Sequence, residues 1–210
     1  VTVPHTELQC ITGFGVGQDL PWVVEVDSLA NSLAATSYGA PELHSLTLYE
    51  DWICNDDLNG SLSSSCASSS SDNSFTVSTT GGDYVVLQGK NFGGRQAFIQ
   101  YISFGPTATE YVLVDSTTGI SECNLTVPHV IITCRVPPGN GKMHSWRIVI
   151  AGICNSIVLS GQGGGPYLNY SSPNITGVFP GKVGITSGGY EVTVTGNNYG
   201  PMSDISVYYW

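Results

Sequence analysis

The stretch TTGGDYVVLQGKNFG, residues 79–93, returns later in the chain as TSGGYEVTVTGNNYG, residues 186–200. Seven of the 15 aligned pairs are identical, and most of these are glycine or asparagine. In both copies a pair of glycines precedes a run rich in β-branched residues, and a second glycine-containing turn follows it. Such runs between glycine-rich turns are typical of strands in a β-sandwich or barrel. The repeat therefore predicts an all-β fold built from related units.

A second repeat links the start of the chain to its second half. Residues 1–33 align without gaps with residues 125–157, and ten of the 33 pairs are identical. Past a gap of eight residues the match continues. The matched pairs that matter below are His5/His129, Cys10/Cys134, Gly15/Gly139, Gly17/Gly141, Trp22/Trp146, Tyr38/Tyr170 and Pro41/Pro173. Pro41 and Pro173 then mark equivalent boundaries between units.

These two repeats predict an incomplete unit at each end of the sequence. Residues 1–40 correspond to the C-terminal half of a unit, residues 41–172 to a complete unit, and residues 173–210 to the N-terminal half of a third. The central unit carries an insertion of about 25 residues relative to the third, at roughly residues 47–73. The expected organisation is one whole unit between two opposite halves.

Seven short β-branched or aromatic runs are predicted to be strands. They lie at residues 84–88, 98–104, 110–114, 130–136, 146–151, 157–160 and 191–195. Residues 26–35 show a weak helical periodicity, but they align with the strand-like residues 150–159. We therefore expect no helix there.

The ordered set of motifs resembles the IPT/TIG immunoglobulin-like repeat. The matching features are a Pro-x-Ile start at 173–175, the Gly-Gly to Asn-Phe-Gly stretch at 81–93, an apolar-Phe-Gly strand at 102–105, the cysteines at 123 and 134, a Pro-x-Gly-x-Gly turn at 137–141 and an apolar strand at 147–150. The resemblance implies tandem immunoglobulin-like β-sandwiches. Such repeats occur in cell-surface receptors, adhesins, matrix proteins and some transcription factors. Fold alone does not choose among these functions.

Composition disfavours nucleic acid as a partner. The sequence has 6 Lys+Arg against 16 Asp+Glu, a formal net charge of −10, and its basic residues are scattered. Binding a phosphate backbone requires clustered Lys or Arg. No run of apolar residues is long enough to span a membrane. Charged residues make up only 10 % of the chain, against about 25 % in an average protein. Covalent sugar is an obvious candidate for keeping such a surface hydrated.

Cysteines and glycosylation sequons together predict an extracellular or cell-surface protein. Six cysteines occur without a C-x-x-C pair, which favours disulfides in an oxidising compartment over zinc. The four N-x-Ser/Thr sequons are at Asn59, Asn124, Asn169 and Asn174. Ser61 and Ser74 bound a low-complexity serine-rich segment, which is either a flexible loop or a site of O-linked glycans.

Two disulfides are expected, and two cysteines remain without an assigned partner. Cys54 and Cys66 lie within the insertion and are expected to pair there. Cys123 and Cys134 bracket a strand turn and resemble the cysteine pair of the IPT/TIG repeat. Cys10 matches Cys134, but its expected partner falls in the part that the incomplete unit lacks. Cys10 and Cys154 are therefore paired with each other, paired across chains, or free.

No motif in the sequence supports catalysis, a metal site or a cofactor site. A histidine that recurs in two structural repeats, as His5 and His129 do, is expected to serve packing or a turn. Trp22 and Trp146 are expected in a sandwich core, with sugar stacking as the alternative. Four carboxylates around Cys54 fit no calcium-loop spacing and are interpreted as a solvated loop.

The incomplete units suggest a function in assembly. A half sandwich exposes an apolar face and an unpaired strand edge. Because the two ends are opposite halves, the front half of one chain can be completed by the back half of another. A head-to-tail contact of this kind does not close on itself. The leading hypothesis is a structural protomer of an extracellular, glycosylated filament that polymerises with copies of itself.

Two other functions remain open. The halves together lack a counterpart of residues 107–124, so a composite unit would be about one strand short. This favours the alternative that residues 1–210 are a window of a longer array, as in the ectodomain of a receptor or adhesin. A third class, a secreted carbohydrate-binding module or enzyme accessory domain, rests only on Trp22 and Trp146.

Overall fold

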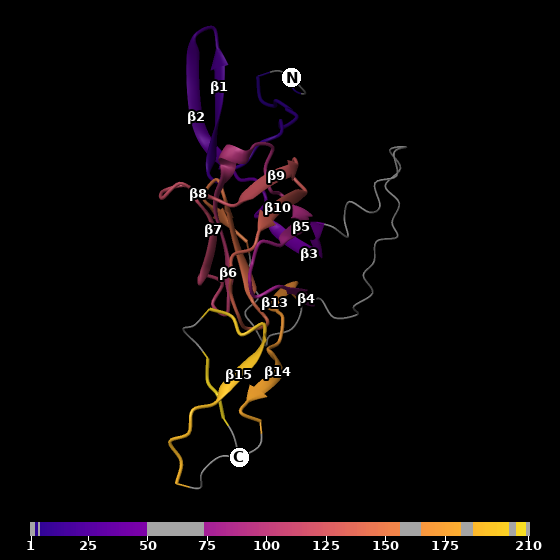
Figure 1. Ribbon diagram of the computed structural model, residues 1–210. Helices are drawn as coiled ribbons and strands as arrows, with labels where there is room; N and C mark the ends of the chain where they lie inside the picture. The colour runs from indigo at the N-terminus through magenta and orange to yellow at the C-terminus, as the bar shows by residue number, and fades with distance from the viewer. Residues whose placement is uncertain are drawn as a thin grey trace, which may run out of the picture.

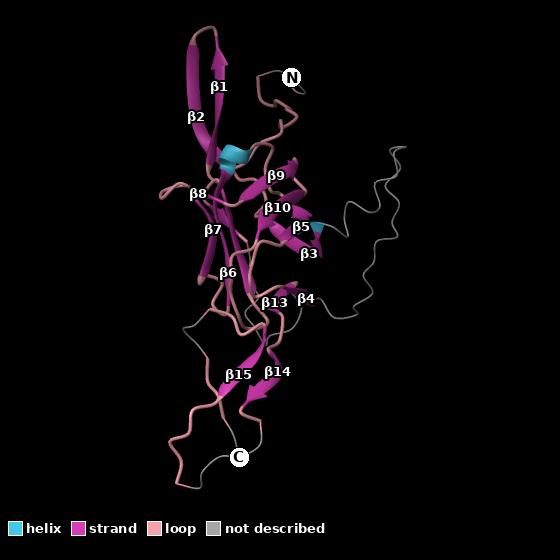
Figure 2. Ribbon diagram, viewed as in Figure 1, coloured by secondary structure: helices cyan, strands magenta, loops and turns pink. Residues whose placement is uncertain are grey.

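The computed structural model describes residues 3, 5–49, 74–155, 165–181, 187–201 and 205–208. In this part of the chain nearly all regular structure is β-strand, and most strands pair antiparallel (Figure 2). The prediction of an all-β chain is therefore confirmed. Within the described residues, no helix is long and apolar enough to cross a membrane.

The first of two larger sheets has four strands in the order β3-β5-β10-β9. These are β3 (Glu42–Leu48), β5 (Tyr84–Lys90), β10 (Ile131–Arg135) and β9 (Cys123–Val127). All three pairings are antiparallel. β5 and β10 therefore occupy the centre of the sheet, and the predicted runs 84–88 and 130–136 both fall on these central strands.

The second sheet has five strands in the order β12-β11-β6-β7-β8. They are β12 (Ile153–Cys154), β11 (Ser145–Ile150), β6 (Ile99–Gly105), β7 (Tyr111–Asp115) and β8 (Ile120–Ser121). Every pairing in this sheet is also antiparallel. A short 3-10 helix, η1 (Gln96–Phe98), leads into β6.

One hydrophobic core joins the two sheets. Val85 and Leu87 of β5 and Ile132 of β10 are fully buried from the first sheet, and Ile102 and Ile148 are fully buried from the second. Alternate residues of a strand point to opposite faces, so these positions place one apolar face of each sheet on the core. This packing is consistent with a β-sandwich. We call residues 41–49, 74–155 and 165–172 the central body.

A disulfide and a parallel strand pair complete the central body. Cys123 and Cys134 are bonded across β9 and β10 and are both buried, which confirms the expected pair. Closing a loop of this length contributes about 3 kcal/mol through the unfolded state. β4 (Ser74–Val77) pairs parallel with β13 (Tyr167–Tyr170), and both strands add residues to the core.

Two hairpins project from opposite ends of the central body (Figure 1). At one end, β1 (Leu20–Val26) pairs with β2 (Leu29–Thr36) in the N-terminal arm, the described residues up to 40. At the other end, β14 (Asn174–Phe179) pairs with β15 (Thr193–Asn197) in the C-terminal arm, the described residues from 173 onward. Every residue of β1 and β2 is exposed.

Several sequence predictions concern residues at or beyond the limits of the described chain. The insertion expected at about 47–73 falls almost entirely outside the described residues, and β3 extends to Leu48 at its start. Residues 26–35 form the end of β1, a turn and most of β2, as the rejection of a helix there required. The predicted strand at 157–160 lies outside the described residues, as do Asn59 and the Cys54–Cys66 pair.

Candidate functional site

The N-terminal arm repeats the backbone conformation of the second half of the central body. Five pairs of residues, each 124 positions apart, share a positive φ, which is uncommon for residues other than glycine. The paired φ values are 67° and 69° at His5 and His129, 113° and 96° at Gly17 and Gly141, 53° and 57° at Asp19 and Met143, 47° and 46° at Asp27 and Ala151, and 68° and 85° at Ser28 and Gly152. The sequence repeat therefore coincides with a repeat of backbone geometry.

The C-terminal arm repeats the first half of the central body in the same way. The pairs with positive φ are Gly81/Gly188, Gly82/Gly189, Asn91/Asn198 and Gly93/Gly200. The β3–β5 pairing has a register shift between Leu43 and Ser45, and β14–β15 has its counterpart between Ile175 and Gly177. Matched turns and a matched irregularity give β14 and β15 the geometry of β3 and β5.

Side-chain hydrogen bonds recur at equivalent places too. Tyr38 donates its hydroxyl to the Gly13 carbonyl at 2.8 Å, and Tyr170 donates to the Pro137 carbonyl at 2.9 Å. The side-chain amide of Asn91 donates to Ala40 O at 2.8 Å. Its counterpart Asn198 donates to Ser172 O at 3.2 Å. These bonds set the path of the chain where each arm joins the central body.

The N-terminal arm exposes residues whose counterparts form the core of the central body. Trp22 is 39 % exposed, whereas its counterpart Trp146 is 3 % exposed. Val24 is 46 % exposed, whereas Ile148 is fully buried. Leu8 is exposed as well, and Ile132, its counterpart, is buried. The expected core role is confirmed for Trp146, but Trp22 is not buried within this chain.

The C-terminal arm likewise exposes residues whose counterparts are buried in the central body. Val192 is 46 % exposed, and its counterpart in β5, Val85, is fully buried. Beyond residue 200 the alignment places Ser206 on Ser103, so Ile205 corresponds to Ile102 of β6. Ile205 is 48 % exposed, whereas Ile102 is fully buried. Val207, 69 % exposed, corresponds to Phe104. Both arms therefore expose several apolar side chains at positions whose counterparts are buried in the central body.

Each arm also has an unpaired strand edge among the described residues. In the central body β5 lies between β3 and β10, and β11 lies between β12 and β6. β15, the counterpart of β5, pairs only with β14, while β1, the counterpart of β11, pairs only with β2. The missing neighbour of β15 is the counterpart of β10, which the N-terminal arm carries at residues 7–11. The missing neighbour of β1 is the counterpart of β6, which the C-terminal arm carries at residues 205–208.

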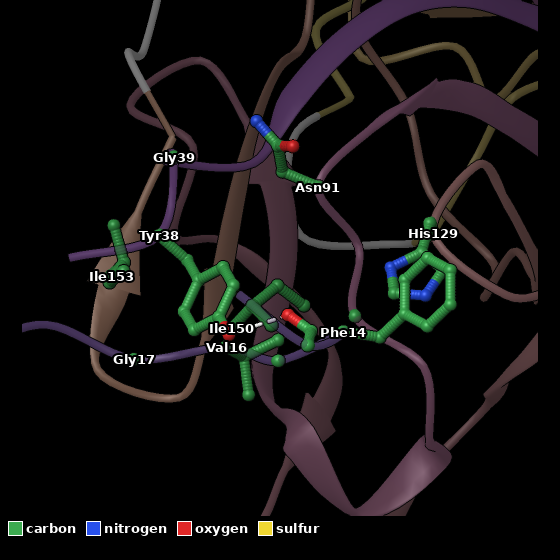
Figure 3. A pocket seen from close by; sticks show the side chains of 12 residues that line it. Phe14, Val16, Gly17, Tyr38, Gly39, Asn91, His129, Ile150 and Ile153 are labelled. Carbon is green, nitrogen blue, oxygen red and sulfur yellow. Dashed lines mark hydrogen bonds between the residues drawn. The ribbon is translucent and has the colours of Figure 1, made fainter. Parts of the chain in front are cut away.

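The N-terminal arm meets the central body at a small pocket (Figure 3). Val16 packs against the body core, and Tyr38 lines the pocket beside it. From the body, Ile150, Ile153 and His129 contribute to the lining. The Phe14 and His129 rings lie 5.6 Å apart between centroids. His129 is also held in its turn by backbone bonds to residues 92 and 93, so it fills the turn role expected of the histidine pair.

The remaining predicted sites lie at separate places on the described surface. Asn124 is exposed on β9 and Asn174 is exposed at the start of β14. Asn169 is half-buried on β13, where its Oδ1 accepts the Met143 N–H at 2.6 Å. Cys10 and Cys154 are free and exposed in the single chain. Among the described residues, no group of His, Cys, Asp or Glu side chains has the arrangement of a metal site.

One buried histidine, which lies in a cluster of aromatic rings, was not predicted from the sequence. His144 is 1 % exposed and lies among the rings of Phe104, Tyr111 and Tyr170, at centroid distances of 5.6 to 5.9 Å. Its Nε2 is 2.9 Å from the Asn140 carbonyl oxygen. Leu20 occupies the equivalent position in the N-terminal arm, so the repeat alone would have indicated an apolar environment there.

The acid sensitivity of the central body is expected to depend on His144. Burial lowers the pKa of its imidazole below the ordinary 6.5, so the unfolded chain takes up this proton more readily than the folded chain. The free energy of unfolding is therefore at its full value when the pH is above about 6.5. Below that pH it falls by at most about 1.4 kcal/mol per pH unit. Urea unfolding at about pH 7.5 and about pH 5.5 measures the loss.

The control for this prediction is His144→Leu, which introduces the residue found at the equivalent position 20. The leucine variant cannot take up the proton, so its stability should change less between the two pH values than that of the parent. An equal loss in both proteins would show that other groups cause the acid sensitivity.

Comparison of the chain with models of known families, with curated proteins and with solved structures found no match. The geometry of the two arms and of the central body is therefore the basis for the function proposed below.

Proposed function

We propose that this chain is the structural protomer of an extracellular, glycosylated filament, in which the C-terminal arm of one copy and the N-terminal arm of the next complete a β-sandwich together. The organisation behind the proposal is a tandem array of IPT/TIG-like immunoglobulin units, with one complete unit at 41–172 and partial units at 1–40 and 173–210. The observation that carries it is the complementary exposure of core-equivalent residues on the two arms. Neither arm buries these residues within its own chain.

The central body supplies the register for the composite unit. In the first sheet, Thr133 of β10 faces Val86 of β5, and the equivalent residues are Gln9 and Thr193. In the second sheet, Ile148 of β11 faces Ile102 of β6, and the equivalent residues are Val24 and Ile205. With these registers, a strand of one copy would lie on the free edge of a strand in the other.

Completion of the sandwich would bury apolar residues that water now contacts. Trp22, Val24 and Leu8 would come from one copy, and Val192, Ile205 and Val207 from the other. Each such side chain contributes about 1.5–3 kcal/mol when fully buried. Association costs of about 4–15 kcal/mol oppose this gain. Pairing of the two free strand edges adds backbone hydrogen bonds to the apolar contact.

The polarity of the contact determines the form of the assembly. Each copy has one N-terminal and one C-terminal arm, and they project from opposite ends of the central body (Figure 1). The contact joins two different surfaces, and such contacts give either a ring or an open filament. The placement of the arms at opposite ends favours the filament. In this proposal the chain has a structural role rather than an enzymatic one and needs no cofactor. It carries N-linked glycans at Asn59, Asn124, Asn169 and Asn174.

The disulfide supports the extracellular assignment, because disulfides form and persist in oxidising compartments. The exposed positions of Asn124 and Asn174 support glycosylation there, and a glycan on Asn124 would lie on an edge strand that the composite unit does not use. Mass spectrometry before and after enzymatic deglycosylation, with site mapping at these asparagines, tests the modification.

Electron microscopy and denatured mass together test the filament. The proposal expects fibres in the purified material, built from a discrete polypeptide near 22.2 kDa plus sugar. The alternative, a receptor or adhesin ectodomain with flanking units in the same polypeptide, predicts a much larger chain and no fibres. The composite unit has no counterparts of β7 and β8, and this favours the receptor or adhesin alternative.

A further inference from the structure

The junction between the N-terminal arm and the central body has a specific close contact at its centre. A Cβ atom on Gly93 would lie 2.9 Å from Val16 Cγ1 and 3.5 Å from Ile150 Cγ2. Because Gly93 has no side chain, Val16 and Ile150 can close around it. His129 and Ile153 line the same pocket from the central body (Figure 3).

The junction at the other end of the central body contains half of the same arrangement. Asn140 stands at the position of Val16, and Gly200 stands at the position of Gly93. A Cβ on Gly200 would lie 3.0 Å from Asn140 Cβ, which reproduces the approach seen at the first junction. Asn198 holds the connecting segment through Ser172, as Asn91 does through Ala40.

The other half of this second junction lies at the far end of the chain. The counterparts of His129, Ile150 and Ile153 are His5, Val26 and Leu29 of the N-terminal arm. Val26 is 68 % exposed and Leu29 is 79 % exposed. The N-terminal arm projects from the opposite end of the central body to the C-terminal arm (Figure 1). A chain therefore cannot bring these residues to its own Asn140.

Completion of the composite core does not account for the exposure of Leu29. Its counterpart Ile153 is half-buried, and it lines the junction pocket rather than the buried core. An apolar residue of β2 at this place has a partner only when another unit lies against it. The partner at the first junction is the segment of residues 13–17 with Tyr38. The equivalent segment at the second is residues 137–141, behind which Tyr170 is buried in the core of the central body.

We propose that residues 137–141 form a second docking surface, which receives His5, Val26 and Leu29 of the copy that completes the composite unit. This inference rests on the proposed filament. Each contact between copies then has two parts, the shared sandwich and a junction onto the neighbouring central body. The junction fixes the angle between the composite unit and the body, so junctions within a chain and between chains have the same geometry along the filament.

A photoreactive benzophenone amino acid at position 5 tests this surface. Chains labelled with ¹⁵N are mixed with unlabelled chains before assembly, so that mass spectrometry distinguishes cross-links between copies from those within one. The distance from His129 Nε2 to a Cβ built on Gly94 is 3.4 Å. The His129 ring also packs against Phe14. By the repeat, position 5 should contact both Pro201 and Pro138 of the neighbouring copy.

The matched control places the same group at position 129, where φ is 69° against 67° at position 5. It should cross-link to residue 14 of its own chain. At position 5, mixed-isotope cross-links to both 199–201 and 137–141 are expected, and Val24→Asp should abolish them by preventing assembly. Cross-links to 199–201 alone would overturn the second docking surface and leave the filament standing. The absence of any link between copies would overturn both.

Discussion

Replacing Val24 by aspartate is expected to stop polymerisation while leaving the central body folded. Val24 is 46 % exposed in the single chain, so the carboxylate remains hydrated there. In the composite unit position 24 corresponds to Ile148, which is fully buried between the sheets. Burying an unpaired charge costs several kcal/mol, and the apolar contact of the valine is lost as well. A penalty of about 4 kcal/mol or more raises the critical concentration about 10³-fold.

The neighbouring residue provides the control for this experiment. Val23 is 61 % exposed and corresponds to Arg147, which points away from the core-facing positions of β11. Val23→Arg should therefore polymerise at nearly the concentration of the parent. Pelleting and electron microscopy across a concentration series measure both variants, and circular dichroism checks that the central body is folded. Polymerisation of Val24→Asp at the parental concentration would contradict the proposal.

Alanine at the two equivalent tryptophans is expected to produce two different losses. Trp146 is 3 % exposed and its ring lies 4.9 Å from that of Phe104, so Trp146→Ala should lower the free energy of unfolding by about 3–5 kcal/mol. Trp22 is 39 % exposed, and its indole N–H donates to Thr36 Oγ1 at 3.2 Å. Trp22→Ala should leave the unfolding free energy of the central body nearly unchanged.

The cost of Trp22→Ala should appear in assembly instead. If Trp22 enters a composite core as Trp146 enters the body core, a similar loss of about 3–5 kcal/mol weakens the contact between copies. This corresponds to an increase of about 10²- to 10⁴-fold in the critical concentration. Urea unfolding of dilute chains and pelleting of concentrated chains separate the two effects. Normal polymerisation of Trp22→Ala would show that this tryptophan lies outside the interface.

The central strands could be predicted because their residues determine their structure locally. β5, β6 and β11 are β-branched or aromatic runs bounded by turn residues, and their predicted positions agree with the structure to within a few residues. β3 was not predicted, because His44 and Ser45 interrupt its apolar pattern. Its pairing with β5 compensates for weak local preference, since strand propensity depends strongly on neighbours.

Pairings between distant segments were not predictable from local pattern. β4 and β13 are four-residue strands on either side of most of the central body, and they pair in parallel. A parallel pair has no connecting hairpin turn to mark it in the sequence. The burial of His144 was missed for a related reason, because its aromatic neighbours come from β6, β7 and β13.

The candidate site was largely accessible from the sequence, because it depends on a comparison of repeats rather than on local propensity. The identities at Trp22/Trp146 and Gly93/Gly200 give the correspondence, and the buried member of each pair shows what the other member lacks. What required coordinates was the strand register, including the matched irregularities in β3 and β14. A shift of one residue would reverse which side chains face a composite core.

A disulfide between Gln9→Cys and Thr193→Cys is the most direct measurement of contact between the arms. These residues correspond to Thr133 and Val86, which face each other across β10 and β5. In a chain whose free Cys10 and Cys154 are replaced by serine, mild oxidation under assembly conditions should give a ladder of covalent oligomers on a non-reducing gel. Either cysteine alone should give at most dimers. If the double variant runs as a monomer on the non-reducing gel although it still forms fibres, the copies are joined by some contact other than the shared sandwich.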